Sequence, residues 1–225
     1  RSYSFGDQVC VAPFNFDNSD ELVESLRGAT TLYNTYWVRF PRGQTTFDAA
    51  IENTKTLLKA AKEAGVRRVV HISITNASEE STLPYFRSKA IVEKAVASSG
   101  LSHAIIRPTE IFGPEDILIN NLAWMLRRFP AVAVPGSGDY RVQPVFVEDV
   151  AEIAVDAAQR DENLVLDAVG PEAYTFNEMV RLIADAVHSR ARIVHLNPKL
   201  AFFLSRLVGY LVRDVVLTRD EVEGL

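Results

Sequence analysis

The sequence predicts an α/β fold with a doubly wound parallel sheet and a small C-terminal α/β lobe. Candidate strands and helices alternate through the first half of the 225 residues, which is typical of parallel βαβ units. The helix candidates there are followed by glycine, the residue that most often ends a helix. With 48% hydrophobic and 24% charged residues, the chain has the composition of a globular protein with a substantial core.

The first half contains runs that are apolar or rich in β-branched residues, separated by segments with helical spacing of apolar residues. The expected strands are 8–16, 29–37, 66–74 and 102–113. The expected helices are 20–26, 47–64 and 85–99. In sheets of this kind ligands bind beyond the carboxyl ends of the strands, so we expect a site at that edge.

The second half has a different pattern. Helices are expected at 118–129, 147–158 and 175–189, and strands within 136–147 and 163–170. Thr175 and Glu178 have the spacing of a capping box, and Asp149 lies near the start of its helix, where a carboxylate is stabilising. We therefore expect a sheet domain in 1–116 with parts of 140–170, and a lobe in most of 117–225.

Charge and cysteine content exclude several classes of function. The net charge is −5 and no basic block is present, so nucleic acid is not expected as a partner. The single cysteine, Cys10, allows no internal disulfide and predicts a reducing compartment such as the cytoplasm. The histidines lack ligand spacing, so no metal is expected, and His71 is expected to be a hydrogen-bonded core residue.

The candidate catalytic pair is Tyr85 and Lys89, in the segment PYFRSKAIVEKA. Residues four apart share one helix face, and a nearby ammonium lowers the pKa of a tyrosine from its usual value of about 10. A tyrosine tuned in this way can exchange a proton with a carbonyl or alcohol oxygen. Ser73 and Thr75 compete for the role of a hydroxyl that holds this oxygen, and we favour Thr75 because it lies nearer the end of its strand.

These motifs together resemble the short-chain dehydrogenase/reductase superfamily, in its extended or atypical branch of epimerases and dehydratases. The resemblance rests on the segments AIENTKTLLKAAKEAGVRRVVHISI, PYFRSKAIVEKAV, IIRPTEIFGPED and QPVFVEDVAEIAV. In detail the chain is most similar to the nucleotide-binding accessory subunit of respiratory complex I and its bacterial relatives. That closer likeness rests on the combination of HISITNAS, PYFRSKA, PTEIFGPED, QPVFVEDV, VGPEAYTFNEMV and LTRDEVE.

The resemblance implies a Rossmann-like domain that binds NADP(H), with NAD(H) as the alternative. Lys89 would hold the ribose, and the cofactor would lie against a set of residues matched to the family pattern. These are Arg1, Phe16, Asp17, Asn34, Tyr36, Asn53, Tyr85, Lys89, Pro108 and Thr109. For Asn34 and Tyr36 a plain role at the rim of a loop is the alternative. The function is then either an oxidoreductase or epimerase acting on a small, unidentified carbonyl or alcohol substrate, or a subunit that binds NADPH without turnover.

Two further expectations concern the ends of the chain. No Gly-x-Gly-x-x-Gly or Gly-x-x-Gly-x-x-Gly is present, so we expect the first βαβ unit and its phosphate loop to lie upstream of Arg1. The segment Lys199 to Leu217 is apolar but is interrupted by arginines, and is too short between charges to span a bilayer. It packs on the lobe, or it contacts a membrane surface or protein partner through Leu200 to Leu217, which would make the protein membrane-peripheral.

Overall fold

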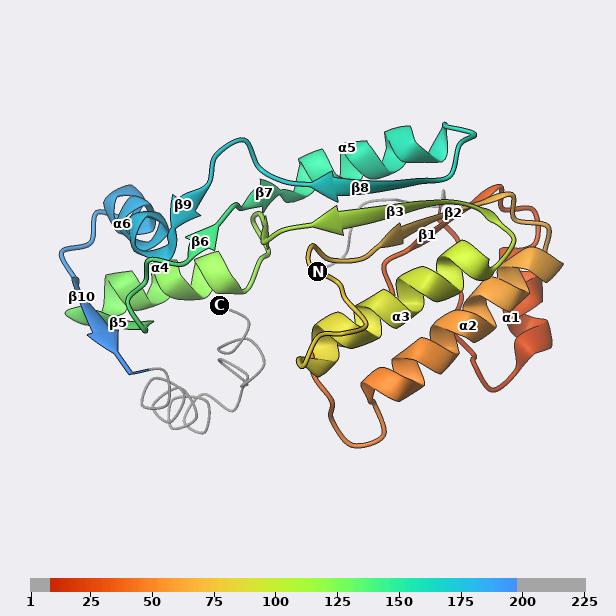
Figure 1. Cartoon of the computed structure of the whole chain (residues 1–225), viewed down its shortest axis with the longest axis horizontal. Coiled ribbons are helices and arrows are strands. Elements are labelled where there is room, and N and C mark those ends of the chain that lie inside the picture. Colours follow the sequence, from red (N-terminus) through yellow and green to blue (C-terminus); the bar gives the residue numbers. More distant parts are fainter. Residues whose placement is uncertain (1–8, 198–225) are drawn as a thin grey trace.

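The computed structural model describes residues 9–197 and contains a parallel sheet of four strands in the order β1-β2-β3-β8 (Figure 1). The strands are β1 (Thr31–Asn34), β2 (Arg68–Ile72), β3 (Ser102–Pro108) and β8 (Leu164–Ala168). Val70 of β2 lies opposite Tyr33 of β1 and Ala104 of β3 in the hydrogen-bonded register. The predicted α/β fold is confirmed.

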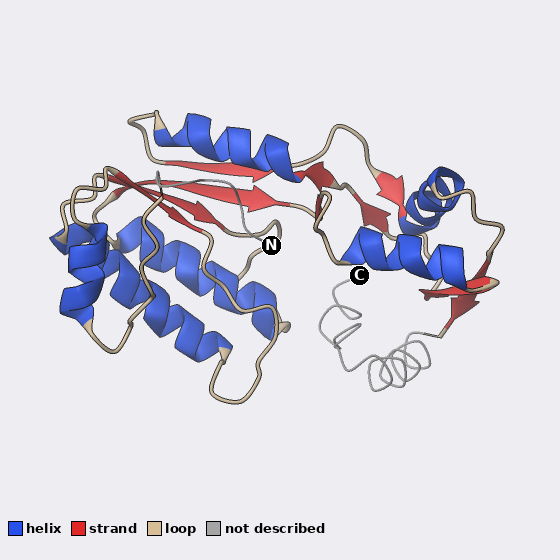
Figure 2. Ribbon diagram, turned by 180° about the vertical axis from the view of Figure 1, so that it is seen from behind, coloured by secondary structure: helices blue, strands red, loops and turns tan. Residues whose placement is uncertain are grey.

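Helices cover both faces of the sheet, as the doubly wound arrangement requires (Figure 2). One face carries α1 (Ser19–Leu26), α2 (Phe47–Glu63) and α3 (Pro84–Ser98), and the other carries α5 (Val147–Ala158). Alternate strand residues point to opposite faces: Val69 packs in the core under α2 and α3, whereas Val70 packs in the core under α5. The two cores fix the sheet between the helix layers.

The predicted helix ends are confirmed to within one residue, except that the helix predicted at 175–189 ends three residues early, at Ala186. Thr46 caps α2 by accepting a hydrogen bond from the Ala49 N–H, and Pro84 occupies the first turn of α3, where a missing N–H costs nothing. Gly65 follows α2 with φ 83° and Gly100 follows α3 with φ 77°, a conformation that strains other residues.

The prediction of a strand at 8–16 is wrong. The described part of this segment, from Val9 onward, contains no strand, and Val11 is 94% exposed. Alternating residues form a strand only where a neighbouring strand supplies hydrogen bonds, and none does so here within residues 9–197. The strand expected at 29–37 is also shorter than predicted, because only Thr31–Asn34 pair with β2.

The lobe consists of two helices and short strands. Its elements are α4 (Leu118–Arg128), β5 (Ala131–Pro135), β6 (Arg141–Val142), β9 (Tyr174–Thr175), α6 (Phe176–Ala186) and β10 (Arg192–Leu196). The capping box of Thr175 and Glu178 is confirmed at the start of α6. Strands β5 and β10 pair in parallel and were not predicted from the sequence.

The chain passes between sheet and lobe three times, after β3, before α5 and after β8. The short parallel pair β4 (Ile111–Phe112) and β7 (Val145–Phe146) lies in two of these connections. The Gln143 side-chain amide donates to the Gly170 carbonyl at 2.5 Å. A Cβ at Gly170 would lie 1.8 Å from the Pro144 carbonyl oxygen, so this crossing requires glycine.

Within residues 9–197 no helix is both long and apolar enough to cross a bilayer.

Candidate functional site

The candidate site lies where β1, β2 and β3 end and α3 begins. Asn34 is the last residue of β1, Ser73 follows β2, and Pro108 is the last residue of β3. The parallel strands place these residues at one edge of the sheet. Helix α3 runs back along the sheet from this edge, so its first turns carry Tyr85 and Lys89 to the same place (Figure 1).

Lys89 is the buried cation of the site, at 4% exposure. Its ammonium donates to the Ile72 carbonyl at 3.1 Å and lies 4.7 Å from the centre of the Trp37 ring. Burial lowers the pKa of Lys89 to about 8, opposed by the charge of Glu93 one turn further along α3. Lys89 is therefore held in place by a carbonyl and an aromatic face.

Glu93 is engaged by Arg107 of β3. The two form a forked ion pair with contacts of 3.0 Å and 2.5 Å, and the Glu93 side chain is 9% exposed. The hydrogen bond to Glu93 is the main cause that raises the pKa of Arg107. Both carboxylate oxygens of Glu93 bond to Arg107, so Glu93 raises the pKa of Lys89 through the attraction between their charges and not through a hydrogen bond.

Tyr85 is surrounded by aromatic rings. It lies edge-on to Trp37, with ring centres 6.2 Å apart, and edge-on to Phe47 at 5.9 Å. Trp37 and Phe47 stack on each other at 5.8 Å. Neither residue was proposed from the sequence, although the position of Trp37 just beyond the end of β1 is the signal that could have found it.

The two candidate hydroxyls differ in what they contact. The Ser73 hydroxyl is buried and has no hydrogen-bond partner among residues 9–197. Thr75 donates its hydroxyl to the Pro108 carbonyl at 3.4 Å and its N–H to the same oxygen at 3.0 Å. Thr75 thus joins the ends of β2 and β3, whereas the Ser73 hydroxyl makes no such bond within the described residues.

Asn34 and His71 form a buried pair between β1 and β2. The Asn34 side-chain oxygen accepts from the Tyr36 N–H at 3.1 Å, so its NH₂ group faces His71 Nδ1 at 3.0 Å. His71 Nδ1 is then the acceptor and Nε2 carries the hydrogen. Burial, followed by the charge of Lys89, lowers the pKa of His71 to about 3.

His71 is a buried core residue bonded through Nδ1, as expected, but its buried Nε2 has no hydrogen-bond partner within the described residues. Tyr36 and Asn53 of α2 are brought together by a bond of 2.9 Å from the Asn53 amide to the Tyr36 hydroxyl. Both strand-end side chains, Asn34 and Tyr36, therefore support the rim of the site.

Two other predicted cofactor residues lie beside this rim. The Phe16 ring packs 5.2 Å from Tyr36 and 5.5 Å from Phe14, and Asp17 is exposed just before α1. The structure thus brings Phe16 to Tyr36 and leaves the Asp17 side chain in solvent. Arg1 and the segment Leu200 to Leu217 lie outside the described residues.

The residues after β3 are tied to the crossing toward the lobe. Pro108 is buried, and the Thr109 hydroxyl donates to the Gln143 carbonyl at 2.5 Å while its N–H donates to the Ala168 carbonyl at 3.1 Å. The Thr109 hydroxyl proton is therefore used within the protein.

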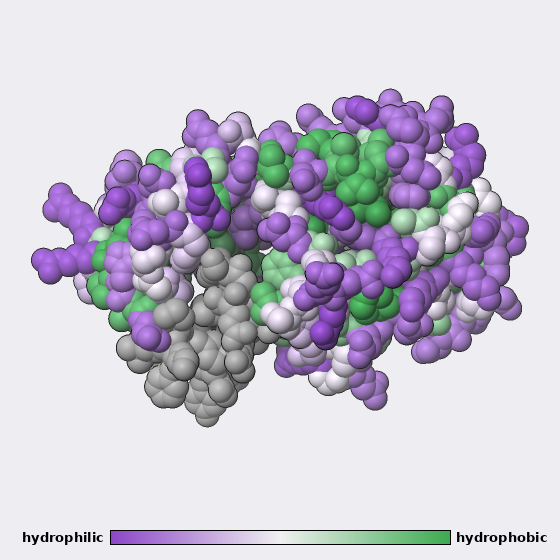
Figure 3. Space-filling view, viewed as in Figure 1, coloured by the Kyte–Doolittle hydropathy of each residue, from purple (hydrophilic) through white to green (hydrophobic). Residues whose placement is uncertain are grey.

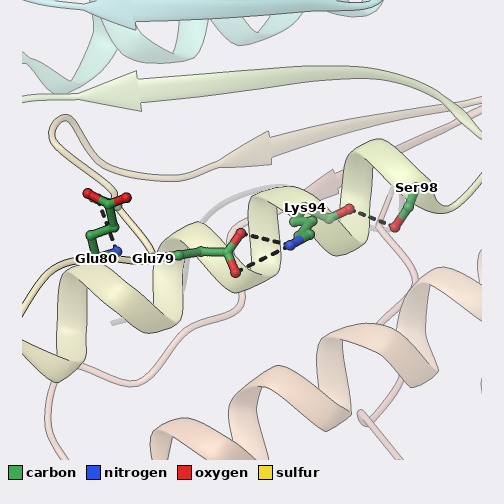
Figure 4. Close-up of polar contacts among 5 residues, drawn as sticks. Glu79, Glu80, Lys94 and Ser98 are labelled. Carbon is green, nitrogen blue, oxygen red and sulfur yellow. Dashed lines mark hydrogen bonds and ion pairs between the residues drawn. The ribbon is translucent and has the colours of Figure 1, made fainter.

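The loop between β2 and α3 is held against α3 by an ion pair (Figure 4). Lys94 contacts both carboxylate oxygens of Glu79, at 3.0 Å and 3.3 Å, and both side chains are more than half exposed. Ser98 donates to the Lys94 carbonyl one turn further on. Solvent screens such a pair, so it aligns the loop more than it stabilises the fold.

Within residues 9–197 no three His, Cys, Asp or Glu side chains converge as metal ligands. Cys10 is exposed.

Among curated proteins, the chain is similar to the mitochondrial NADH dehydrogenase [ubiquinone] 1 alpha subcomplex subunit 9 of Rattus norvegicus. Identity is 33% over 182 residues, which cover 79% of this chain and 48% of the rat protein. The chain therefore spans about half the length of this relative.

Two solved structures have a similar fold. MoeE5 in complex with UDP-glucuronic acid and NAD is 25% identical with a TM-score of 0.66, covering 78% of this chain and 68% of MoeE5. A nucleoside-diphosphate-sugar epimerase from Staphylococcus aureus is 15% identical with a TM-score of 0.72, covering 97% of this chain and 75% of the epimerase. These matches agree with a Rossmann-like sheet.

The family follows from a match along most of the chain. The sequence model of the NmrA-like family matches residues 6–204, a range that includes the whole sheet, α3 and the described elements of the lobe. The chain belongs to the NmrA-like family.

Proposed function

We propose that this chain binds a nicotinamide dinucleotide across the carboxyl edge of β1, β2 and β3. The observation that carries the proposal is the buried Lys89 ammonium, which makes one hydrogen bond within residues 9–197 and can make two more. Buried donors need partners, and the vicinal hydroxyls of a ribose would supply them. The similar fold of MoeE5, whose structure contains NAD, supports the same assignment.

We further propose that Tyr85 and Lys89 are an acid–base pair for a small carbonyl or alcohol substrate. The nicotinamide ring supplies or accepts the hydride. The Tyr85 hydroxyl gives its proton to the carbonyl oxygen in reduction, or takes a proton from the alcohol in oxidation, and the charge of Lys89 stabilises the phenolate. The Ser73 hydroxyl, which has no partner within residues 9–197, would donate to the same substrate oxygen.

This assignment reverses the preference for Thr75 over Ser73. Thr75 already donates to Pro108, so using its hydroxyl on a substrate would leave the Pro108 carbonyl without that bond. Ser73 has no such bond to give up. The hydroxyl at the end of β2 that acts on the substrate is therefore proposed to be Ser73.

A second function, binding without turnover, is supported by two observations. Tyr85 packs edge-on against Trp37 and Phe47, so its ring is fixed by aromatic contacts. The rat relative is by name a subunit of NADH dehydrogenase. In this alternative Lys89 and Tyr85 only hold the cofactor, and the protein contributes to a larger assembly.

The experiment uses the purified full-length protein. NADPH and NADH binding are measured by calorimetric titration, and turnover by cofactor absorbance with a panel of aldehydes and ketones. Lys89→Met should weaken binding about tenfold or more, since a hydrogen bond to a charged group contributes about 1.5–3 kcal/mol. Tyr85→Phe should retain binding and lower turnover by about 10²-fold or more, the usual contribution of a positioned acid.

Tyr33→Phe is the matched control, because Tyr33 is an exposed tyrosine on β1 outside the site. Turnover that survives in Tyr85→Phe would exclude the acid–base role. Tight binding with no turnover of any substrate would favour the second function. Unchanged cofactor binding by Lys89→Met would contradict the proposal that the cofactor binds at Lys89.

The choice between NADP(H) and NAD(H) is a proposal that depends on Arg1. We favour NADP(H), because an arginine after the second strand of such folds binds the 2′-phosphate. A preference for NADH in the same titration would overturn it. The cytoplasm stays the predicted compartment, although the rat relative is mitochondrial by name.

A further inference from the structure

An open hollow of about 920 Å³ lies at the end of the lobe that points away from α3 (Figure 1). Its walls are the C-terminal end of α4 and the connection from α6 to β10. Figure 3 shows hydrophilic side chains projecting from this end of the molecule. The hollow is thus separate from the site at Tyr85 and Lys89.

Four arginines line this hollow, and we call it the arginine hollow: Arg127, Arg128, Arg190 and Arg192. His188 also lines it, whereas no aspartate or glutamate does. All four arginines are exposed, and their guanidinium groups form no ion pair or hydrogen bond with any part of the described chain.

Helix stabilisation explains only part of this cluster. Arg127 and Arg128 lie in the last turn of α4, where cations stabilise the negative end of a helix. Arg190 and Arg192 lie beyond α6, whose own last turn has no basic residue. Two helix ends contribute about −0.5 charge each, so the four guanidinium groups leave the hollow strongly positive.

The two arginine pairs are held at a fixed spacing by the backbone. The Ser189 hydroxyl donates to the Leu126 carbonyl at the end of α4. The Arg192 N–H donates to the Pro130 carbonyl at 2.9 Å, at the start of the parallel pair of β5 and β10. The connection carrying Arg190 and Arg192 is therefore joined to the helix end carrying Arg127 and Arg128.

We propose that the arginine hollow binds a phosphate group. The planar guanidinium fork matches the oxygens of a phosphate in two parallel hydrogen bonds. Such a group could come from a soluble phosphorylated compound or from a phospholipid headgroup. Phe129 lines the hollow and packs edge-on against Trp124, with ring centres 5.7 Å apart. Both rings are exposed, an arrangement suited to the interface of a lipid layer.

The test compares two arms on the purified full-length protein. In the first, inorganic pyrophosphate is titrated calorimetrically. In the second, co-sedimentation is measured with vesicles of phosphatidylcholine containing phosphatidylglycerol, and with phosphatidylcholine alone. The variant is R190Q/R192Q, which leaves the end of α4 unchanged. The control is R67Q/R181Q, which removes the same charge from exposed positions that do not line the hollow.

Binding by the wild-type protein should weaken with added salt, and R190Q/R192Q should bind about tenfold more weakly than the control, as expected for losing bidentate phosphate contacts. Loss confined to pyrophosphate identifies a soluble ligand, and loss confined to phosphatidylglycerol vesicles identifies a lipid headgroup. Equal binding by the variant and the control, or no wild-type binding in either arm, would overturn the proposal. Matching melting temperatures of the two variants confirm that a loss is not due to unfolding.

Discussion

The ammonium of Lys89 lies 4.7 Å from the centre of the Trp37 ring, so the buried charge at the end of β2 is covered by an aromatic face. Trp37 in turn stacks on Phe47. A cation over an indole ring is attracted to it, and the attraction grows as water is removed. The contact with Trp37 offsets part of the desolvation free energy of the buried Lys89 ammonium, which forms no ion pair with a carboxylate within residues 9–197.

We predict that Lys89 makes folding depend on pH in the alkaline range. Its pKa is lowered from 10.5 to about 8 in the folded protein. Between these values the unfolded chain holds more protons, so the free energy of unfolding should rise with pH by about 3 kcal/mol. Urea titrations of the wild type and Lys89→Met between these pH values measure it, and a rise of equal size in both proteins would contradict the prediction.

A second prediction concerns Trp37. Its indole N–H is buried without a hydrogen-bond partner among the described residues, and its ring occupies the space over Lys89 that a ribose would approach. In the Trp124→Phe variant, where Trp37 is the remaining tryptophan of two, NADPH should change the emission of Trp37. Trp37→Phe, which retains only Trp124 in the lobe, should show no such change. Identical responses of the two variants would place the nucleotide elsewhere.

We also predict a loss of stability in acid that depends on His71. Its pKa is lowered from 6.5 to about 3, so the unfolded chain takes up a proton in this range while the folded protein does not. The free energy of unfolding should fall by on the order of 4 kcal/mol as the pH decreases from 6.5 to 3. His71→Phe should have a flatter profile in chemical denaturation, whereas profiles that superimpose would show that His71 is not responsible.

The Glu93–Arg107 pair should stabilise the fold more than the Glu79–Lys94 pair. Glu93 is 9% exposed and Arg107 is 32% exposed, so Glu93→Gln should lower the free energy of unfolding by about 2 kcal/mol, below the usual cost of breaking a fully buried pair. Glu79→Gln removes the same charge from an exposed pair (Figure 4) and should cost less than about 1 kcal/mol. Thermal and urea denaturation measure both, and equal effects would refute the ranking.

Local signals in the sequence predicted the helices and most of the sheet. Gly65 and Gly100 mark the ends of α2 and α3 because they adopt positive φ there. The prediction of a strand at 8–16 was wrong because the alternation of polar and apolar residues shows which face each side chain would take, but not whether a neighbouring strand is there to pair with. Strands β5 and β10 were missed for a related reason, since they pair with each other across α5, β8 and α6.

The part of the candidate site that lies on α3 was predictable from the sequence. Helical spacing places Tyr85 and Lys89 together, and the end of β2 brings Ser73 and Thr75 close to them. The choice of Ser73 depends on a hydrogen bond between Thr75 and Pro108, which no spacing reveals. The aromatic residues Trp37 and Phe47 likewise reach Tyr85 from separate elements, so only the fold shows that they meet it.

The three crossings between sheet and lobe determine how this molecule can be divided. A single proteolytic nick in the connection after β8, at Gly170, would leave two covalent connections and the parallel pair of β4 and β7 between the halves. Neither half is one uninterrupted stretch of the gene, so no single truncation removes one half and leaves the other whole. Recombination that exchanges the lobe between relatives would have to replace several separate segments at once, with glycine kept at position 170.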